Sequence, residues 1–109
     1  MTWAVKYLPE AERDLAALDN SQRILVLKAI TKVSRNPLPK SEGGYGVPLG
    51  NHNVARLAGL LKIKLRQSGL RIVYKLVRVN DEMVIVVVGA RADYEAYRTA
   101  ELRAAEADG

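Results

Sequence analysis

Cationic side chains recur at every second position in the middle of the chain, at Lys62, Lys64 and Arg66. On a β-strand alternate side chains share one face, so the three would stand in a row about 7 Å apart. Like charges at that spacing repel one another, and a bound polyanion would offset the repulsion. The spacing therefore indicates a face that binds phosphates, although alternating lysines are also typical of a solvated sheet face or a protected sheet edge.

The segment around these cations has the pattern of a β-hairpin. Apolar residues at positions 61, 63 and 65 alternate with the three cations, as in a half-buried strand. A turn is expected at residues 67–69, where Gly69 can adopt a positive φ. Residues 71–76 then return as a second strand rich in β-branched and aromatic side chains. Such a hairpin would turn its apolar face into a core and leave its cationic face open to a ligand.

The composition is that of a basic protein with one core. The chain has 109 residues, of which 49% are hydrophobic, so residues 1–109 are expected to form one folded domain. The formal net charge is +5, and residues 62–91 hold seven Lys or Arg against two acids. This excess favours an acidic partner such as RNA, DNA, an acidic protein or a membrane surface.

Neither a metal nor another cofactor is expected from the sequence. The chain has no cysteine and a single histidine, His52, whose surroundings are typical of a loop. A nuclease that uses histidine as both acid and base is not expected either, because one histidine cannot fill both roles. The carboxylates do not cluster at the spacing of metal ligands. The N-terminal apolar run is too short for a signal peptide, and no stretch approaches the roughly 20 apolar residues of a membrane span. A cytoplasmic protein with no membrane partner is therefore expected.

Grouped helices and grouped strands predict an α+β fold. The expected order is β-α-α-β-β-β-α, with a small, mainly antiparallel sheet, an N-terminal helical hairpin on one face and a C-terminal helix. Beyond the basic hairpin, the pattern predicts a strand at residues 3–8, helices at 9–19 and 20–35, a long loop at 37–53, a doubly buried strand at 83–88 and a helix at 94–105. Asn20 or Ser21 is expected to cap the second helix, and Asp93 the last.

The hairpin belongs to a longer motif. Residues 62–74 have the sequence KIKLRQSGLRIVY, residues 88–91 have the sequence VGAR, and Tyr97 follows six residues after Arg91. These segments resemble the K-x-K-L-R-x-S-G-x-R-x-V-Y core, the V-G-x-R motif and the C-terminal tyrosine of the RelE family of bacterial toxins from type II toxin–antitoxin systems. The expected layout of elements also fits, so the resemblance covers most of the chain.

The resemblance implies an activity and a set of partners. Similar family members are metal-independent endoribonucleases that cut mRNA in the ribosomal A site and inhibit translation. The implied partners are the ribosome, mRNA and a RelB-like antitoxin; the toxin alone would be a monomer and would form a higher-order complex with the antitoxin. By the same resemblance the family's catalytic lysines, active-site arginines and C-terminal tyrosine correspond to Lys62, Lys64, Arg71, Arg91 and Tyr97.

Two features depart from the family pattern. The loop at residues 37–53 is longer and richer in glycine than in relatives, which bears on the path of the substrate or the contact with the antitoxin. Leu61 stands where some relatives have a tyrosine, which bears on codon preference.

The residues support this chemistry independently of the family. RNA is cut without metal when its own 2′-hydroxyl attacks the adjacent phosphorus, which needs a base, an acid and cations for the developing charge. Lys64 is assigned as the base, because cations around a lysine favour its neutral form. Arg91 is assigned as the acid or charge stabiliser. Arg71 would bind the scissile phosphate, and Lys62 would give electrostatic support.

Tyr97 is the fifth residue of the catalytic set, and two further candidates are expected to bind RNA. Tyr97 can stack on a splayed RNA base, although a tyrosine on an amphipathic helix is ordinarily a packing residue. Arg66 and Lys75 are expected to bind RNA, and for Arg66 a tie to a helix carboxylate is the structural alternative.

Two other classes of function stay open. A ParE-like toxin with the same fold would inhibit DNA gyrase by binding, with no nuclease chemistry and no need for the five residues assigned to catalysis. A basic nucleic-acid-binding module without toxicity is the third class, and a neighbouring reading frame for an acidic antitoxin would count against it.

Overall fold

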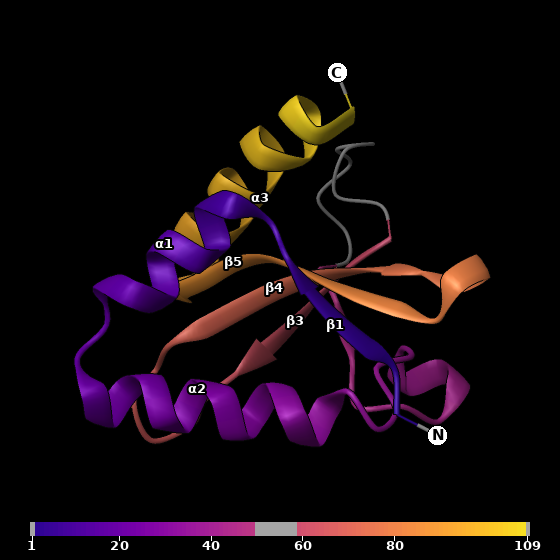
Figure 1. Cartoon of the computed structure of the whole chain (residues 1–109), viewed down its shortest axis with the longest axis horizontal. Helices are drawn as coiled ribbons and strands as arrows, with labels where there is room; N and C mark the ends of the chain where they lie inside the picture. The colour runs from indigo at the N-terminus through magenta and orange to yellow at the C-terminus, as the bar shows by residue number, and fades with distance from the viewer. Residues whose placement is uncertain (1, 50–58, 109) are drawn as a thin grey trace.

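A five-stranded sheet forms the centre of the computed structural model, which describes residues 2–49 and 59–108. The strands lie in the order β1-β5-β4-β3-β2 (Figure 1). Neighbouring strands are antiparallel except β1, which runs parallel to β5. Their bounds are Ala4–Tyr7 for β1, Val47–Pro48 for β2, Leu60–Lys64 for β3, Arg71–Val77 for β4 and Glu82–Ala90 for β5. The expected α+β architecture with a mainly antiparallel sheet is confirmed.

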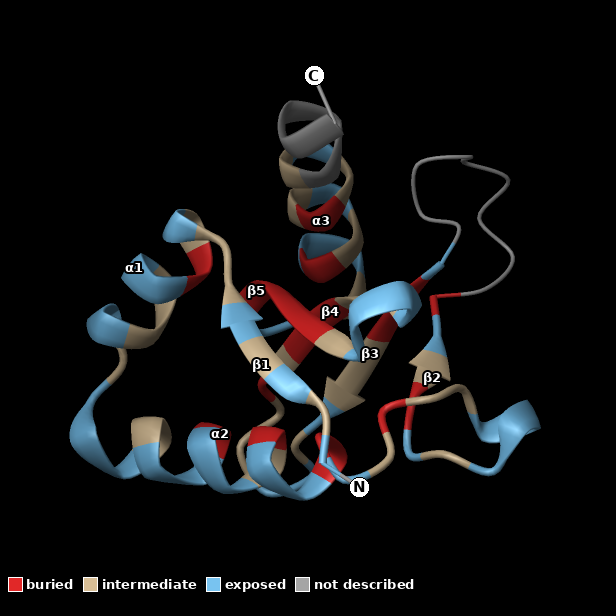
Figure 2. Ribbon diagram, turned by 45° about the vertical axis from the view of Figure 1, so that its right-hand side comes forward, coloured by how far each residue is buried: buried red, intermediate tan, exposed pale blue. Residues whose placement is uncertain are grey.

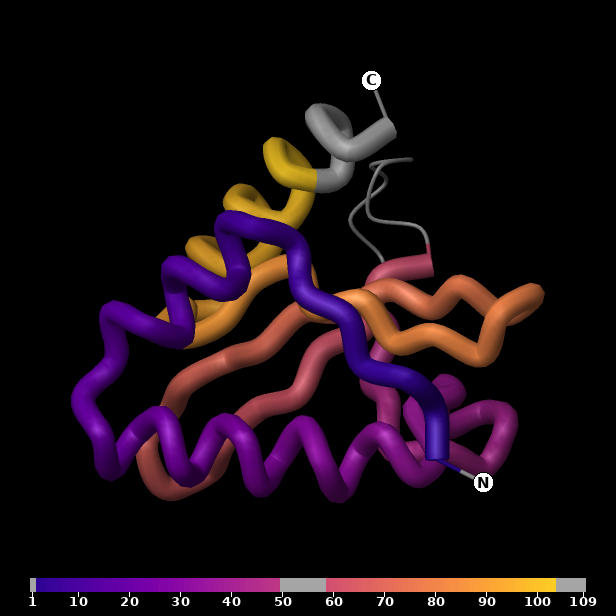
Figure 3. Tube along the Cα trace, viewed as in Figure 1, coloured from indigo at the N-terminus to yellow at the C-terminus, as the bar shows by residue number. Residues whose placement is uncertain are grey.

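Helices cover both faces of this sheet. They are α1 at Pro9–Ala17, α2 at Asn20–Val33 and α3 at Asp93–Asp108, with a 3₁₀ turn, η1, at Lys40–Glu42. The chain can be followed in Figure 3 from β1 through the α1–α2 hairpin and back into the sheet. As expected, this hairpin packs on one face, while α3 packs on the other.

Two apolar cores hold the three layers together. The first lies between the α1–α2 hairpin and the sheet and includes Val26, Ile30 and Ile72. The second lies under α3, where the small side chains of Ala96 and Ala100 let the helix approach the strands. Figure 2 shows the buried residues gathered in the middle strands and on the inner sides of the helices. Both faces of the sheet are thus largely covered by helices.

The helix boundaries follow from local chemistry, with one correction. Pro9 begins α1, and Glu10 and Glu12 lie in its first turn, where carboxylates are favoured by the helix dipole. The expected cap of α2 at Asn20 or Ser21 is wrong, because Asp19 occupies that position. Its carboxylate accepts a hydrogen bond from the backbone amide of Gln22 at 2.8 Å. An aspartate one residue earlier thus takes the capping role.

The short strand β2 is the element that the sequence pattern did not predict. Val47 and Pro48 lie within the segment expected to be a loop, yet they pair with Lys62 and Leu61 of β3. Two residues leave no periodic signal, and proline is tolerated here because β2 is an edge strand. Only residues 37–49 of that expected loop are described, and His52 lies outside the described residues.

β5 lies between β1 and β4, as its buried sequence predicts, and it carries two bulges. Its register against β4 skips Val86 and Gly89, and Gly89 has a φ of +87° that favours glycine. The bulges leave backbone groups without ladder partners. The Val86 carbonyl accepts a hydrogen bond from Nη1 of Arg103 at 2.8 Å, and the Val88 amide donates to Oδ2 of Asp14 at 3.0 Å. Side chains from α3 and α1 therefore complete the central strand.

Candidate functional site

The fold brings the five predicted catalytic residues to one region of the sheet. Lys62 and Lys64 lie on β3, and Arg71 lies on β4 directly opposite Lys64. Arg91 follows the last residue of β5, and Tyr97 lies in the N-terminal half of α3. Figure 1 shows how the turn from β5 into α3 brings these segments together. Residues 35 positions apart in the sequence thus share one site.

Lys62 is held by two side chains of α3. Its Nζ donates to the Tyr97 hydroxyl at 2.8 Å and lies 3.4 Å from Oδ1 of Asp93. The same ammonium lies 5.2 Å from the centre of the Tyr97 ring, within the range of a cation–π contact. Burial alone would lower the pKa of Lys62, but the Tyr97 hydroxyl and the Asp93 charge outweigh it and leave the pKa above its usual value. The contacts of Lys62 therefore favour its charged form.

Arg71 is held as firmly as Lys62. Its Nε donates to Oδ1 of Asp93 at 2.9 Å, and its Nη1 donates to the backbone carbonyls of Gly69 and Arg91. These bonds join the tip of the β3–β4 hairpin to the segment that carries Arg91. Arg71 is therefore a clamp within the site as well as a cation in it.

Asp93 is the functional residue that sequence reasoning missed. The sequence predicted it only as a helix cap, whereas its carboxylate contacts both Lys62 and Arg71. The hydrogen bond from Arg71 is the main reason that the pKa of Asp93 lies below its usual value, and the charge of Lys62 adds to it. The sequence feature that could have pointed to Asp93 is its position, because it is an acid two residues after Arg91 in a region rich in cations.

Replacing Asp93 with asparagine should remove a pH-dependent part of the stability. The folded protein lowers the pKa of this carboxyl, so its contribution is present above the unfolded aspartate pKa of about 3.9 and is lost as pH falls through the lower folded value. Urea midpoints of the wild type and Asp93→Asn should differ at pH 6, and the difference should shrink as the pH falls below about 4. Glu95→Gln, which alters an exposed acid of the same helical turn, is the control. A difference that persists unchanged at pH 3 would contradict the ion-pair explanation.

Lys64 and Arg91 have the opposite character from Lys62 and Arg71. Both side chains are exposed, and no residue in the described part of the chain forms a hydrogen bond or ion pair with either of them. Arg66 is also exposed and lies just beyond β3; the described residues offer it no carboxylate partner. Lys75 lies four residues from Arg71 along β4, about 13 Å away at the usual strand rise. The site thus combines two fixed cations with two that are open to a ligand.

A groove of about 660 Å³ runs along the outer edge of β3. Among the described residues, its walls hold no acid and five cations, which are Lys32, Lys40, Lys62, Lys64 and Arg66. It lies between β3, the C-terminal half of α2 and the segment around η1. A cationic groove that ends at the site suits an extended polyanion.

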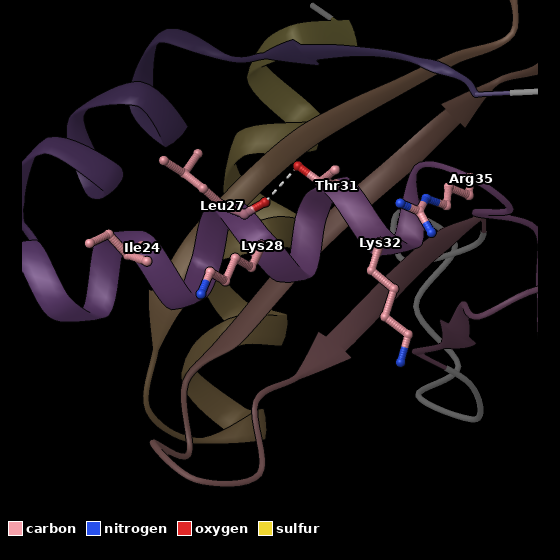
Figure 4. Close-up of a pocket in the computed structure, with 6 residues that line it drawn as sticks. All are labelled: Ile24, Leu27, Lys28, Thr31, Lys32 and Arg35. Carbon is pink, nitrogen blue, oxygen red and sulfur yellow. Dashed lines mark hydrogen bonds between the residues drawn. The ribbon is translucent and has the colours of Figure 1, made fainter.

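A second hollow lies on the outward face of α2, where it is lined by Ile24, Leu27 and Thr31 with basic residues around them (Figure 4). The Thr31 hydroxyl donates to the Leu27 carbonyl at 2.9 Å, a bond within the helix. Ile24 and Leu27 are 45% and 40% exposed. The hollow has no acid and no paired nucleophile, so it offers a contact surface rather than chemistry.

Among the side chains that the structure describes, at residues 2–49 and 59–103, no group of three or more His, Cys, Asp or Glu could hold a metal ion. No helix in the described part of the chain is long and apolar enough to cross a membrane.

Solved structures of other proteins have the same architecture, although neither a family model nor a curated protein sequence matches the chain. A mutant of the E. coli toxin RelE in the free state aligns with a TM-score of 0.72 at 22% identity, over 94% of this chain and 98% of that one. The chain has the RelE fold. The resemblance to the RelE family noted in the sequence is thereby confirmed at the level of the fold.

Two RelE–RelB-type complexes have the same fold. The toxin–antitoxin complex RelBE2 from Mycobacterium tuberculosis aligns with a TM-score of 0.65 at 26% identity, over 84% of this chain and 100% of that one. The archaeal RelE–RelB complex from Pyrococcus horikoshii OT3 aligns with a TM-score of 0.56 at 17% identity, over 84% and 98%. The RelE fold thus extends over most of the present chain in each comparison.

Proposed function

We propose that this chain is the toxin of a toxin–antitoxin pair and that it cuts mRNA in the ribosomal A site without a metal ion. Solved structures with its fold include toxins and toxin–antitoxin complexes. The observation that carries the nuclease assignment is the cation cluster, in which exposed Lys64 and Arg91 stand beside the fixed side chains of Lys62 and Arg71. A protein that acts by binding alone would not need two exposed cations beside two cations that are held in place.

The cluster can be assigned to the steps of RNA cleavage. Lys64 takes the proton of the 2′-hydroxyl while the 2′-oxygen forms a bond to phosphorus. The bond from phosphorus to the 5′-oxygen breaks, and that oxygen receives a proton from Arg91 or from water that Arg91 orients. The products are a 2′,3′-cyclic phosphate and a 5′-hydroxyl end. Arg71 and Lys62 stabilise the added negative charge on the phosphorus oxygens.

The state of Lys62 favours this division of roles. Its ammonium already donates to the Tyr97 hydroxyl and pairs with Asp93, contacts that favour its charged form, so it suits charge stabilisation and not proton removal. Lys64 then remains as the lysine for the base. Asp93 holds Lys62 and Arg71 in place, and a bound phosphate would share or displace these contacts.

The proposal includes three partners. The ribosome would present the mRNA, so the isolated protein should be nearly inert on naked RNA. A RelB-like antitoxin with acidic side chains would cover the cationic groove and block the site, because the groove walls are positive. Such a toxin acts in the cytoplasm, where its ribosomal substrate is found.

The decisive experiment maps mRNA cleavage by primer extension on programmed ribosomes. We expect discrete cuts in the A-site codon that require the ribosome. They should persist when EDTA is added below the magnesium concentration, which removes transition metals and leaves the magnesium that ribosomes need. The double variant Lys64→Ala/Arg91→Ala should make no cuts. Absence of cuts by the folded wild type, together with inhibition of DNA supercoiling by gyrase, would replace the nuclease proposal with the gyrase-inhibitor alternative.

A further inference from the structure

We infer that Tyr45 is a stacking site for an RNA base in the cationic groove that Lys62 and Lys64 also line. The inference rests on the proposed function, because it assigns the groove to the RNA strand that carries the scissile phosphate. Tyr45 lines the same groove as Lys62 and Lys64 but comes from the segment between η1 and β2. This segment was predicted from the sequence only as a long loop.

The backbone around Tyr45 is fixed by hydrogen bonds. The amide of Tyr45 donates to the Asn36 carbonyl at 3.0 Å, and the amide of Gly46 donates to the Leu38 carbonyl at 3.0 Å. The amide of Lys40 closes the turn by donating to the Gly46 carbonyl at 2.9 Å. The position of the ring is therefore set by a folded segment and not by a loose loop.

The two glycines that flank Tyr45 are required by close packing. A β-carbon on Gly44 would collide with the Leu38 carbonyl, and one on Gly46 would collide with the Tyr74 hydroxyl. Tyr45 therefore carries the one side chain in the Gly-Tyr-Gly run. Packing fixes its two neighbours as glycines, but it does not explain an aromatic residue between them.

The Tyr45 ring is placed for a ligand and not for the core. It is 47% exposed, and it belongs to neither of the two apolar cores. Nζ of Lys32 lies 5.4 Å from the ring centre, so a cation sits against the ring within the groove. An aromatic face beside cations is the arrangement that binds single-stranded RNA, with bases on the ring and phosphates on the cations.

The groove connects this ring to the cleavage site. Lys32 and Lys40 line it near Tyr45, and Lys62 and Lys64 line it at the sheet. A strand whose scissile phosphate lies at Lys64 would pass along these cations, and one flanking base would rest on Tyr45. An acidic peptide could use the cations, but it would gain nothing from a flat aromatic face, so RNA is the better match.

The test compares RNA binding by Tyr45 variants of the full chain. The probe is a short unstructured RNA labelled with fluorescein, and affinity is measured by anisotropy at low salt. Tyr45→Leu keeps apolar bulk without a flat ring and should weaken binding about fivefold or more, whereas Tyr45→Phe should stay within about twofold. Tyr94→Leu, which alters another exposed tyrosine outside the groove, is the matched control and should bind like the wild type.

A second measurement uses programmed ribosomes with different A-site codons. A stacking site favours large bases at one position, so Tyr45→Leu should flatten the cleavage preference between purine and pyrimidine there, and Tyr45→Phe should restore it. A purely structural role would lower cleavage of all codons equally and would not be rescued by phenylalanine. Circular dichroism and thermal melting confirm that each variant is folded.

The outcomes separate this inference from the proposed function. If the wild type cuts on the ribosome and Tyr45→Leu neither binds more weakly nor changes base preference, the inference is overturned and the nuclease stands. If the wild type does not cut but Tyr45→Leu weakens RNA binding with rescue by phenylalanine, the stacking site stands and the nuclease proposal fails. Loss of affinity for an acidic antitoxin peptide, with RNA binding unchanged, would also overturn the inference.

Discussion

Replacing Lys64 with methionine should lower the rate of A-site cleavage by a factor of about 10² to 10⁴, the usual contribution of a general base, and should leave the fold intact. The Lys64 side chain is exposed and makes no ion pair with the described residues, so its loss removes no folded-state partner. Methionine keeps a long unbranched side chain and removes the amine. The measurement is the single-turnover rate on programmed ribosomes, with the melting temperature as the test of folding.

The same substitution at Lys62 tests whether the effect is specific to Lys64. Lys62→Met should cause a smaller loss of rate, on the order of tenfold, because the contacts of Lys62 favour its charged form and it acts through its charge. Lys6→Met is the matched control, since Lys6 is an exposed strand lysine on β1 at the opposite edge of the sheet. Equal losses of cleavage rate in Lys62→Met and Lys64→Met would mean that neither lysine can be assigned as the general base. A larger loss for Lys62→Met would reverse the roles proposed above.

The sequence predicts the site well where the site depends on local pattern. The alternation of residues 61–66 and the turn at 67–69 are enough to place Lys64 beside the start of the return strand. They do not fix its partner, because a three-residue loop at 67–69 would pair Lys64 with Ile72, whereas the structure pairs it with Arg71. The VGAR segment likewise places Arg91 where a buried strand ends. Strand alternation, turns and strand ends depend on residues that are close in the sequence, so they can be recognised in the sequence pattern.

The relations that escape prediction act over long distances. Asp93 pairs with Lys62 across 31 positions, and no periodicity marks an ion pair between a strand and a helix. For the same reason, the sequence did not show that Arg71 clamps the Arg91 backbone. The two-residue strand β2 is too short to show alternation, and the bulges in β5 do not change its buried pattern. What the sequence misses is therefore the polar network that holds the cations, and not the cations themselves.

The link between α1 and α3 leads to the second large prediction. Asp14 of α1 binds Arg103 of α3 through two hydrogen bonds, at 2.6 and 3.1 Å, and also accepts the Val88 amide. Both side chains are mostly buried, at 22% and 17% exposure. Asp14→Ala should therefore leave the Arg103 charge without a counter-ion, with the Val86 carbonyl as its remaining partner, and should leave the Val88 amide without its acceptor.

The expected loss of stability for Asp14→Ala is about 2 kcal/mol, below the 3–5 kcal/mol of a fully buried pair because water reaches part of both groups. In a chain of this size that lowers the melting temperature by roughly 10 °C. Glu12→Ala, which removes an exposed acid of the same helix, should shift it by less than about 2 °C. A shift for Asp14→Ala no larger than for Glu12→Ala would show that the link is not a stabilising one.

The same substitution should also loosen the candidate site, although Asp14 does not belong to it. α3 carries both Asp93 and Tyr97, so weaker docking of this helix weakens the contacts that position Lys62 and Arg71. Amide hydrogen exchange in Asp14→Ala should accelerate in α3 and around Val88 more than in α2, whose packing does not involve this pair. The double variant Asp14→Ala/Arg103→Leu should recover part of the stability, because it removes the stranded charge along with its partner. Uniform acceleration of exchange across the chain, with no recovery in the double variant, would mean that Asp14 supports the whole fold and does not specifically hold α3 against the sheet.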